Sequence, residues 1–180
     1  MFDAAALLFA TRGIDAVSLR DIAAEADVDL SQIRRYIGNR AQLVSAVFED
    51  LSDQLAEDVL AYPLSGQGHD TDTVAGRWAR IAGALAISGE LVGRPGFNPV
   101  RSIATTLEVG YGLDPDAARL RAAQVVALAL GWRLFEDYLV AAGDLEAIPL
   151  ATLRDEELRS ARRMGATPWP SPPDPAPHTR

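Results

Sequence analysis

The sequence predicts an all-α protein in which a small N-terminal helix-turn-helix domain precedes a larger helical domain. Apolar residues recur at intervals of three and four in each predicted segment, which is the spacing of one helix face. Residues typical of helix starts precede these segments, and glycine or proline follows them. Near the N-terminus, a tight turn at residues 27–29 separates two short helices. We expect about eight or nine helices in total.

The segment 18–43 contains three helix starts in close succession. Ser18 is a favourable N-cap residue, and Asp21 is three positions on, where its carboxylate can complete a capping box. Asp29 begins a second helix in the same way, with Gln32 at the third position. Asn39 with Gln42 begins the next. This density of caps is typical of a helix-turn-helix.

The second of these helices is predicted to have an apolar inner face and a polar outer face. Ile33 and Ile37 point inward with Val28 beneath them, and Gly38 suits a left-handed helix end. The outward residues are Leu30, Ser31, Gln32, Arg34, Arg35 and Tyr36.

Two further helices complete the predicted N-terminal half. A first helix ends at Gly13, and its apolar face consists of Phe2, Ala5, Ala6 and Phe9. A long helix runs from Arg40 to about Tyr62, where Pro63 stops it. Its apolar row is Leu43, Val47, Leu51 and Leu55.

The run from residue 2 to residue 43 resembles the N-terminal domain of TetR-family transcriptional regulators. The matching pieces are FDAAALLFATRG, VSLRDIAAEADV and DLSQIRRYIGNRAQL. The resemblance implies a DNA-binding domain at 1–45 and a helical effector-binding and dimerisation domain at 46–164. It also implies a homodimer that binds a palindromic double-stranded DNA operator, acts as a repressor, and is released by an unidentified small-molecule effector. The proline-rich composition of residues 165–180 separately predicts a disordered tail.

In a helix-turn-helix, phosphate contacts set the register while outward side chains of the second helix reach base edges. Arg34 is the strongest candidate because its planar fork matches guanine or a phosphate. Gln32 suits adenine, and Leu30 suits a thymine methyl group. The full set expected to contact DNA is Ser18, Arg20, Asp29, Leu30, Ser31, Gln32, Arg34, Arg35, Tyr36 and Arg40.

The charge balance keeps a second interpretation open. The formal net charge is −8, and residues 2–43 contain five arginines against six acidic residues. Positions 30, 32, 34 and 36, often Lys, Thr, Tyr and His in the family, are Leu, Gln, Arg and Tyr here. A different operator accounts for this, and so does a TetR-like dimeric ligand-binding or scaffolding protein that has lost DNA binding.

The C-terminal half is predicted to contain helices at about 73–91, 100–109, 115–142 and 149–164. The third would be roughly 40 Å long. Its segment VVALALGW, residues 125–132, is apolar on every side, which indicates burial on two sides. We expect a homodimer through a four-helix bundle, although enclosure within the monomer is the alternative. The expected interface residues are Val125, Ala129, Leu130, Arg133, Leu153, Leu158 and Ala161.

Aromatic residues of this half are candidates for an effector cavity, with ordinary core packing as the alternative for each. They are Trp78, Phe97, Tyr111, Trp132, Phe135 and Tyr138. The expected effector is an apolar or amphipathic metabolite.

Other functional classes find little support in the composition. The chain has no cysteine and no lysine, its two histidines are isolated, and no acid pair has a recognisable catalytic spacing. We therefore expect no enzyme activity, metal site or cofactor. No apolar stretch approaches the ~18 residues of a membrane span, and no signal peptide is apparent. A cytoplasmic protein with no membrane partner is expected.

Overall fold

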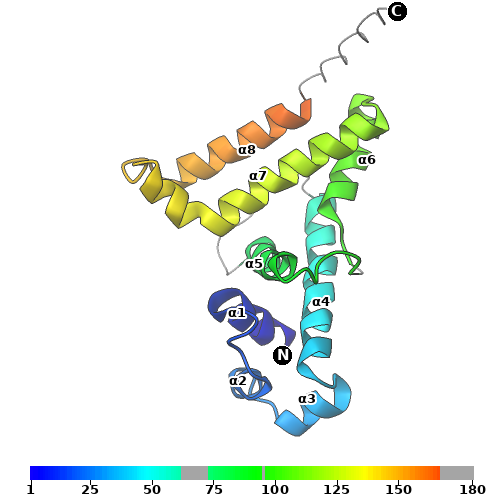
Figure 1. The fold of residues 1–180 in the computed structure, drawn as a ribbon, viewed down its shortest axis with the longest axis vertical. Helices are drawn as coiled ribbons and strands as arrows, with labels where there is room; N and C mark the ends of the chain where they lie inside the picture. Colours follow the sequence, from blue (N-terminus) through cyan, green and yellow to red (C-terminus); the bar gives the residue numbers. More distant parts are fainter. Residues whose placement is uncertain (62–72, 95, 167–180) are drawn as a thin grey trace, which may run out of the picture.

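The computed structural model describes residues 1–61, 73–94 and 96–166, and every regular element in these ranges is an α-helix. The eight helices are α1 (Phe2–Arg12), α2 (Leu19–Glu25), α3 (Leu30–Tyr36), α4 (Arg40–Ala61), α5 (Val74–Ile87), α6 (Pro99–Tyr111), α7 (Pro115–Ala142) and α8 (Leu150–Ala166). Figure 1 shows α2 and α3 at one end of the molecule and the paired α7 and α8 at the other, with α4 running between the two ends. The all-α prediction is confirmed.

Capping boxes start α2 and α4 as predicted. The Ser18 hydroxyl accepts a hydrogen bond from the Asp21 amide at 3.2 Å, and the Asp21 carboxylate accepts one from the Ser18 amide at 2.8 Å. Asn39 Oδ1 accepts from the Gln42 amide at 3.0 Å, and Gln42 Oε1 accepts from the Asn39 amide at 2.8 Å. Each box satisfies backbone donors that a helix start leaves unpaired.

The boundaries of α3 also follow from local chemistry. Asp29 caps the helix by accepting a hydrogen bond from the Ser31 amide at 2.7 Å, and among the described residues Gln32 does not return the bond that a capping box requires. After α3, Gly38 has φ of +102°, where a side chain is unfavourable. A Cβ there would also clash with Gln42 Oε1, so the same glycine makes room for the α4 box.

A first hydrophobic core joins α1 to α5. The predicted apolar row of α4 is buried, and the predicted inward face of α1 packs beneath it. The fully buried members with the largest side chains are Val17, Ile22, Ile33, Leu43, Val47, Leu51 and Ile81. Because this core continues along α4 past residue 45, the N-terminal helices share it with α5.

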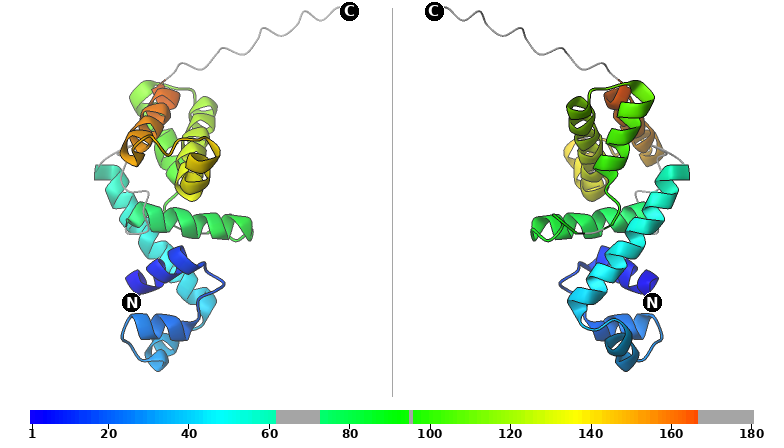
Figure 2. Two further views of the ribbon diagram at one scale, coloured as in Figure 1. Left: turned by 90° about the vertical axis from the view of Figure 1, so that its left-hand side faces the viewer. Right: turned by 90° about the vertical axis from the view of Figure 1, so that its right-hand side faces the viewer.

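The helix α5 lies between the two ends of the molecule and contacts α1, α4 and α7 (Figure 2). Its Trp78 is 6% exposed and stacks on Phe48 of α4, with ring centroids 5.8 Å apart. The Trp78 indole N–H donates to Ser52 Oγ at 3.0 Å, and the Ser52 hydroxyl donates to the Phe48 carbonyl at 2.7 Å. A buried polar chain therefore fixes α5 on α4 within an apolar core.

The predicted end of α5 near Leu91 was wrong, because the helix ends at Ile87. Gly89 takes a φ of +76° two residues later. The amides of Glu90 and Leu91 then donate to the Leu85 carbonyl at 2.8 and 3.0 Å. This closure resembles a glycine-based C-cap and turns the chain out of the helix four residues earlier than apolar spacing suggested.

The helices α6 and α7 form a second, smaller core. Asn98 caps α6, Pro99 occupies its first turn, and Gly112 ends it with φ of +65°. Asp114 caps α7, accepting hydrogen bonds from the amides of Asp116 and Ala117, at 3.0 and 3.3 Å. The buried members of the second core are Ala104, Leu107, Ala118 and Ala122. The small size of three of them allows close approach of the two helices.

The helix α7 spans the predicted residues but is not straight. Phe135 has non-helical backbone angles, φ of −122° and ψ of 15°. Figure 1 shows a bend toward the C-terminal end of α7. Beyond it, Glu136 accepts two hydrogen bonds from Arg154 of α8, at 2.8 and 2.6 Å. This planar, two-point contact holds the end of α7 against α8. The helix α8 continues to Ala166, two residues past its predicted end.

Two predicted segments lie outside the described residues. They are the loop at 63–72, with His69, and all but the first two residues of the tail at 165–180, with His178 and Trp169.

We predict that Ser52→Ala destabilises the protein by about 1–3 kcal/mol, because the buried Trp78 N–H loses its acceptor. Urea unfolding measures the change. In a Trp78→Phe background, which has no indole N–H, most of this cost should disappear. Equal costs in the two backgrounds would contradict the assignment of the hydrogen bond.

Candidate nucleic-acid interface

The helix α3 presents a polar face at the tip of the molecule. Its Ile33 is 1% exposed and anchors the helix in the first core, with Leu30 and Ile37 packed beside it. The exposed side chains of the helix are Ser31, Gln32, Arg34, Arg35 and Tyr36. Figures 1 and 2 place this helix far from α7 and α8, with no other element beyond it. The predicted inner and outer faces are therefore present, except that Leu30, predicted on the outer face, packs against the core.

A short turn sets α3 against α2. The Val28 amide donates to the Ala23 carbonyl at 3.0 Å, and Val28 packs on the core. Asp27 has φ of +50°, a left-handed conformation that aspartate tolerates better than most residues. The two helices and this turn form the helix-turn-helix that the sequence predicted.

Two of the predicted DNA-contacting residues also act as caps. Hydrogen bonds from the Ser18 hydroxyl and amide hold the pKa of the neighbouring Asp21 below its ordinary value. The hydrogen bond from the Ser31 amide lowers the pKa of Asp29 in the same way. Both carboxylates therefore remain charged at neutral pH and stabilise the helix starts next to the polar face.

The arginines of the N-terminal half differ in what they contact. Arg20 and Arg34 are exposed, and the guanidinium of Arg35 lies over the Tyr36 ring, 5.5 Å from its centroid. Tyr36 itself is 76% exposed. Such a cation–π contact orders the two side chains at the end of α3.

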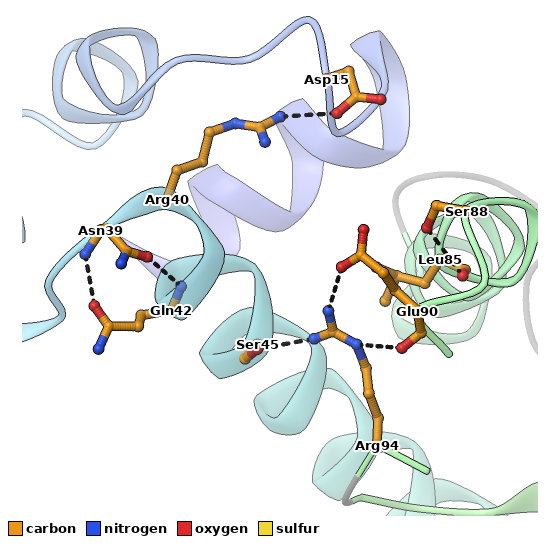
Figure 3. A network of polar contacts seen from close by, with 9 residues as sticks. All are labelled: Asp15, Asn39, Arg40, Gln42, Ser45, Leu85, Ser88, Glu90 and Arg94. Carbon is orange, nitrogen blue, oxygen red and sulfur yellow. Dashed lines mark hydrogen bonds and ion pairs between the residues drawn. The ribbon is translucent and has the colours of Figure 1, made fainter. Parts of the chain in front are cut away.

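Arg40, by contrast, reaches back toward the segment between α1 and α2. Its Nε donates to the Val17 carbonyl at 3.1 Å, and its Nη2 donates to the Ile14 carbonyl. The same nitrogen lies 3.5 Å from Asp15 Oδ1 (Figure 3). The sequence predicted Arg40 as a DNA contact and Leu30 as an outward residue. It predicted neither the inward orientation of Arg40 nor the half-burial of Leu30, because apolar spacing does not show the direction of a side chain at the edge of a helix face.

A contact between α4 and the segment after α5 has no signal in the sequence. Arg94 donates to Ser45 Oγ at 2.8 Å, to the Glu90 carbonyl at 2.7 Å and to the Glu90 carboxylate at 2.8 Å (Figure 3). An open cleft of about 310 Å³ lies beside this contact. Its lining residues are Ser45, Phe48, Glu49, Val92, Gly93 and Arg94.

The predicted effector residues fall in several environments. Trp78 is buried in the first core, and Phe97 packs against that core. Trp132 is half-buried, whereas Tyr111, Phe135 and Tyr138 are 60%, 57% and 69% exposed. None of the six lines the cleft beside Arg94.

The predicted dimer residues divide between packed and partly exposed positions. Val125 and Ala161 are buried within the protomer, and Leu130 packs against the first core. Ala129, Arg133, Leu153 and Leu158 are half-buried. Burial lowers the pKa of Arg133, an effect that the charge of Glu157 opposes. Burial also raises the pKa of Glu157, which the Arg133 charge opposes in turn.

Within residues 1–61, 73–94 and 96–166, no cluster of three or more acidic or histidine side chains is arranged to hold a metal ion. No helix in that part of the chain is both long enough and apolar enough to span a bilayer.

Comparison with known proteins identifies the class of protein to which this chain belongs. The family model described as "Bacterial regulatory proteins, tetR family" matches residues 2–47. The HTH-type transcriptional repressor Rv3405c of Mycobacterium tuberculosis is 31% identical over 156 residues, which cover 86% of this chain and 81% of that protein. The HTH-type transcriptional regulator Mb3439c of Mycobacterium bovis matches equally well.

A solved structure supports the fold. The crystal structure of the multidrug binding protein EbrR complexed with imidazole has a TM-score of 0.50 and 22% identity, covering 94% of each chain. The helix-turn-helix and these relatives define a transcriptional regulator. The chain belongs to the TetR family.

We predict that Asp29→Asn changes the dependence of stability on pH. Because the pKa of Asp29 is lowered in the folded protein, its stabilising charge is fully present above the unfolded value of 3.8 and is lost as pH falls through the folded value. Asparagine caps about as well and does not titrate. Urea unfolding over an acidic pH series should therefore show the variant gaining stability relative to the natural protein as pH falls. If the free energies of unfolding of the two proteins changed equally with pH, the stabilising role of the Asp29 charge would be contradicted.

Proposed function

We propose that this regulator is a repressor that binds a palindromic operator as a homodimer and leaves it when a small-molecule effector binds. The observation that carries the proposal is the polar outer face of α3, exposed at the tip of the molecule while Ile33 holds the helix in the core. The name of the mycobacterial repressor, which is similar over most of this chain, also supports repression.

The exposed residues of α3 suit direct reading of a major groove. Arg34 offers two parallel donors to a guanine edge, and Gln32 offers a donor and an acceptor to adenine. Ser31 suits a base or a phosphate, and Arg20 of α2 and Tyr36 suit phosphates on either side. Ser18 and Asp29 support these contacts by capping α2 and α3.

Exposed apolar residues near α7 and α8 support the homodimer. Leu120, Phe135 and Tyr138 of α7 are 48%, 57% and 69% exposed, and Leu150 at the start of α8 is 46% exposed. Large exposed apolar side chains on paired helices favour a partner surface. Two copies packed as a four-helix bundle would carry their α3 helices to successive major grooves, about 34–36 Å apart or a multiple of this.

Trp132 supports an effector site in the helical domain. Its indole nitrogen is buried and makes no hydrogen bond within the described residues. Because buried donors are nearly always paired, an effector with an acceptor and an apolar body would satisfy this group. This fits the expected amphipathic metabolite.

We predict that Arg34→Ala weakens binding to a cognate palindrome by about 1–3 kcal/mol and relaxes specificity at one base position of each half-site. The palindrome is first selected from a random DNA pool, and titration in a gel-shift assay measures the affinity. Arg101→Ala is the matched control, because Arg101 is an exposed arginine on α6, remote from α3 (Figure 1). Unchanged affinity in the Arg34 variant would remove this residue from the interface.

A second candidate function is favoured by the acidic net charge of −8, namely a TetR-like ligand-binding or scaffolding dimer without DNA binding. A salt series separates the two functions. For an operator-binding dimer, the logarithm of affinity should fall linearly with the logarithm of salt, by about 0.9 for each phosphate contact. No selected DNA, or affinity independent of salt, would favour the second candidate.

A further inference from the structure

Arg40 is the first residue of α4, at the point where this helix leaves the helix-turn-helix. Its guanidinium does not extend along the outer surface of the domain. Instead its Nε donates to the Val17 carbonyl at 3.1 Å, and its Nη2 donates to the Ile14 carbonyl. The same Nη2 faces Asp15 Oδ1 at 3.5 Å (Figure 3). The side chain is 38% exposed as a result.

The two carbonyls belong to the short segment that connects α1 to α2. Val17 is 2% exposed and directly precedes Ser18, whose capping box starts α2. A hydrogen bond that holds the Val17 carbonyl therefore holds the start of the helix-turn-helix. On the other side, Arg40 lies three residues before Leu43, which is fully buried in the first core. The guanidinium thus links two elements that are both already anchored.

The chemistry of this interaction requires arginine. The Nε and Nη2 donors lie side by side on one edge of the planar guanidinium and can reach two carbonyls at once, whereas a lysine ammonium is a point charge on a flexible stem. The ion pair to Asp15 adds little, because the Asp15 side chain is fully exposed and the interaction is screened by solvent. The selective element is the pair of backbone hydrogen bonds.

We infer that Arg40 is a positioning residue that braces α4 against the segment between α1 and α2, and that it is not a phosphate contact. This brace sets the angle at which α4 leaves the helix-turn-helix. Because α4 also carries Ser52 and Phe48, which hold α5, the same angle sets the position of α3 relative to the rest of the protomer. The inference rests on the proposed DNA binding.

The test compares Arg40→Ala, Arg40→Lys and the natural protein in a salt series with the selected palindrome, at a temperature where circular dichroism shows each protein folded. We expect both variants to lose affinity about tenfold at every salt concentration. The slope of the logarithm of affinity against the logarithm of salt concentration should stay the same as in the natural protein. Lysine should fail to restore binding because it keeps the charge and loses the planar fork.

If Arg40 instead binds a phosphate, the result is different. The slope would then fall by about one for each phosphate that the protein no longer neutralises, and Arg40→Lys would retain most of the affinity. Any fall in slope, retention of affinity by the lysine variant, or unchanged affinity of Arg40→Ala overturns the inference. Arg101→Ala is the matched control, because it also removes a guanidinium, here from an exposed position on α6, and should leave DNA affinity unchanged.

A second measurement does not involve DNA. In Arg40→Ala, hydrogen exchange of the Val17 amide, which donates to the Ile14 carbonyl at 3.4 Å, should accelerate, while exchange in α6 and α7 stays the same. Unchanged exchange at Val17 overturns the brace. If the natural protein binds no selected DNA, the proposed function fails, and the role of Arg40 in DNA binding fails with it even where exchange supports the brace.

Discussion

The packing of Trp78 on α4 is the interaction on which the arrangement of the molecule depends. Its ring stacks on Phe48 and its N–H donates to Ser52, so α5 is fixed to α4 both by apolar burial and by a directional bond. The opposite side of α5 meets α7, where a Cβ on Gly83 would lie 3.0 Å from a Leu134 methyl group. Close packing on two sides makes α5 the physical connection between the helix-turn-helix and the helices α6–α8.

The residues that hold the helix-turn-helix together differ from those exposed on the outer face of α3. Buried aliphatic side chains and two helix caps define the positions of α2 and α3, without the exposed side chains of α3. The exposed residues of α3 are therefore able to vary without loss of the fold, which fits their departure from the common family pattern. With a net charge of −8, the molecule as a whole provides little long-range attraction to DNA, so binding must depend on short-range contacts.

Local rules in the sequence predicted most of this fold. The caps at Ser18 and Asn39, the apolar row of α4 and the proline at the start of α7 each involve residues within about four positions of one another, where spacing and structure are directly linked. The polar outer face of α3 followed from the same periodicity. These features needed no knowledge of distant residues.

Features that depend on distant residues were not predictable in this way. The partners of Arg40 precede it by more than twenty positions, and the partner of Arg94 by almost fifty. The bend at Phe135 interrupts a segment whose composition is uniformly helical. The aromatic character of Trp78 suggested an effector contact as readily as core packing, and only its burial and its bond to Ser52 show the packing role. Periodicity identifies faces of helices, whereas tertiary packing decides what each face meets.

The order of the two cores along the chain bears on how the protein is made. Every buried residue of the first core lies at or before Leu85, and among the described residues that pack against it only Leu130 follows Phe97. The second core uses only residues from Val100 onward. During synthesis, a nascent chain that has released its first hundred residues from the ribosome already holds nearly the whole first core, so this half is able to collapse before α7 emerges from the ribosome.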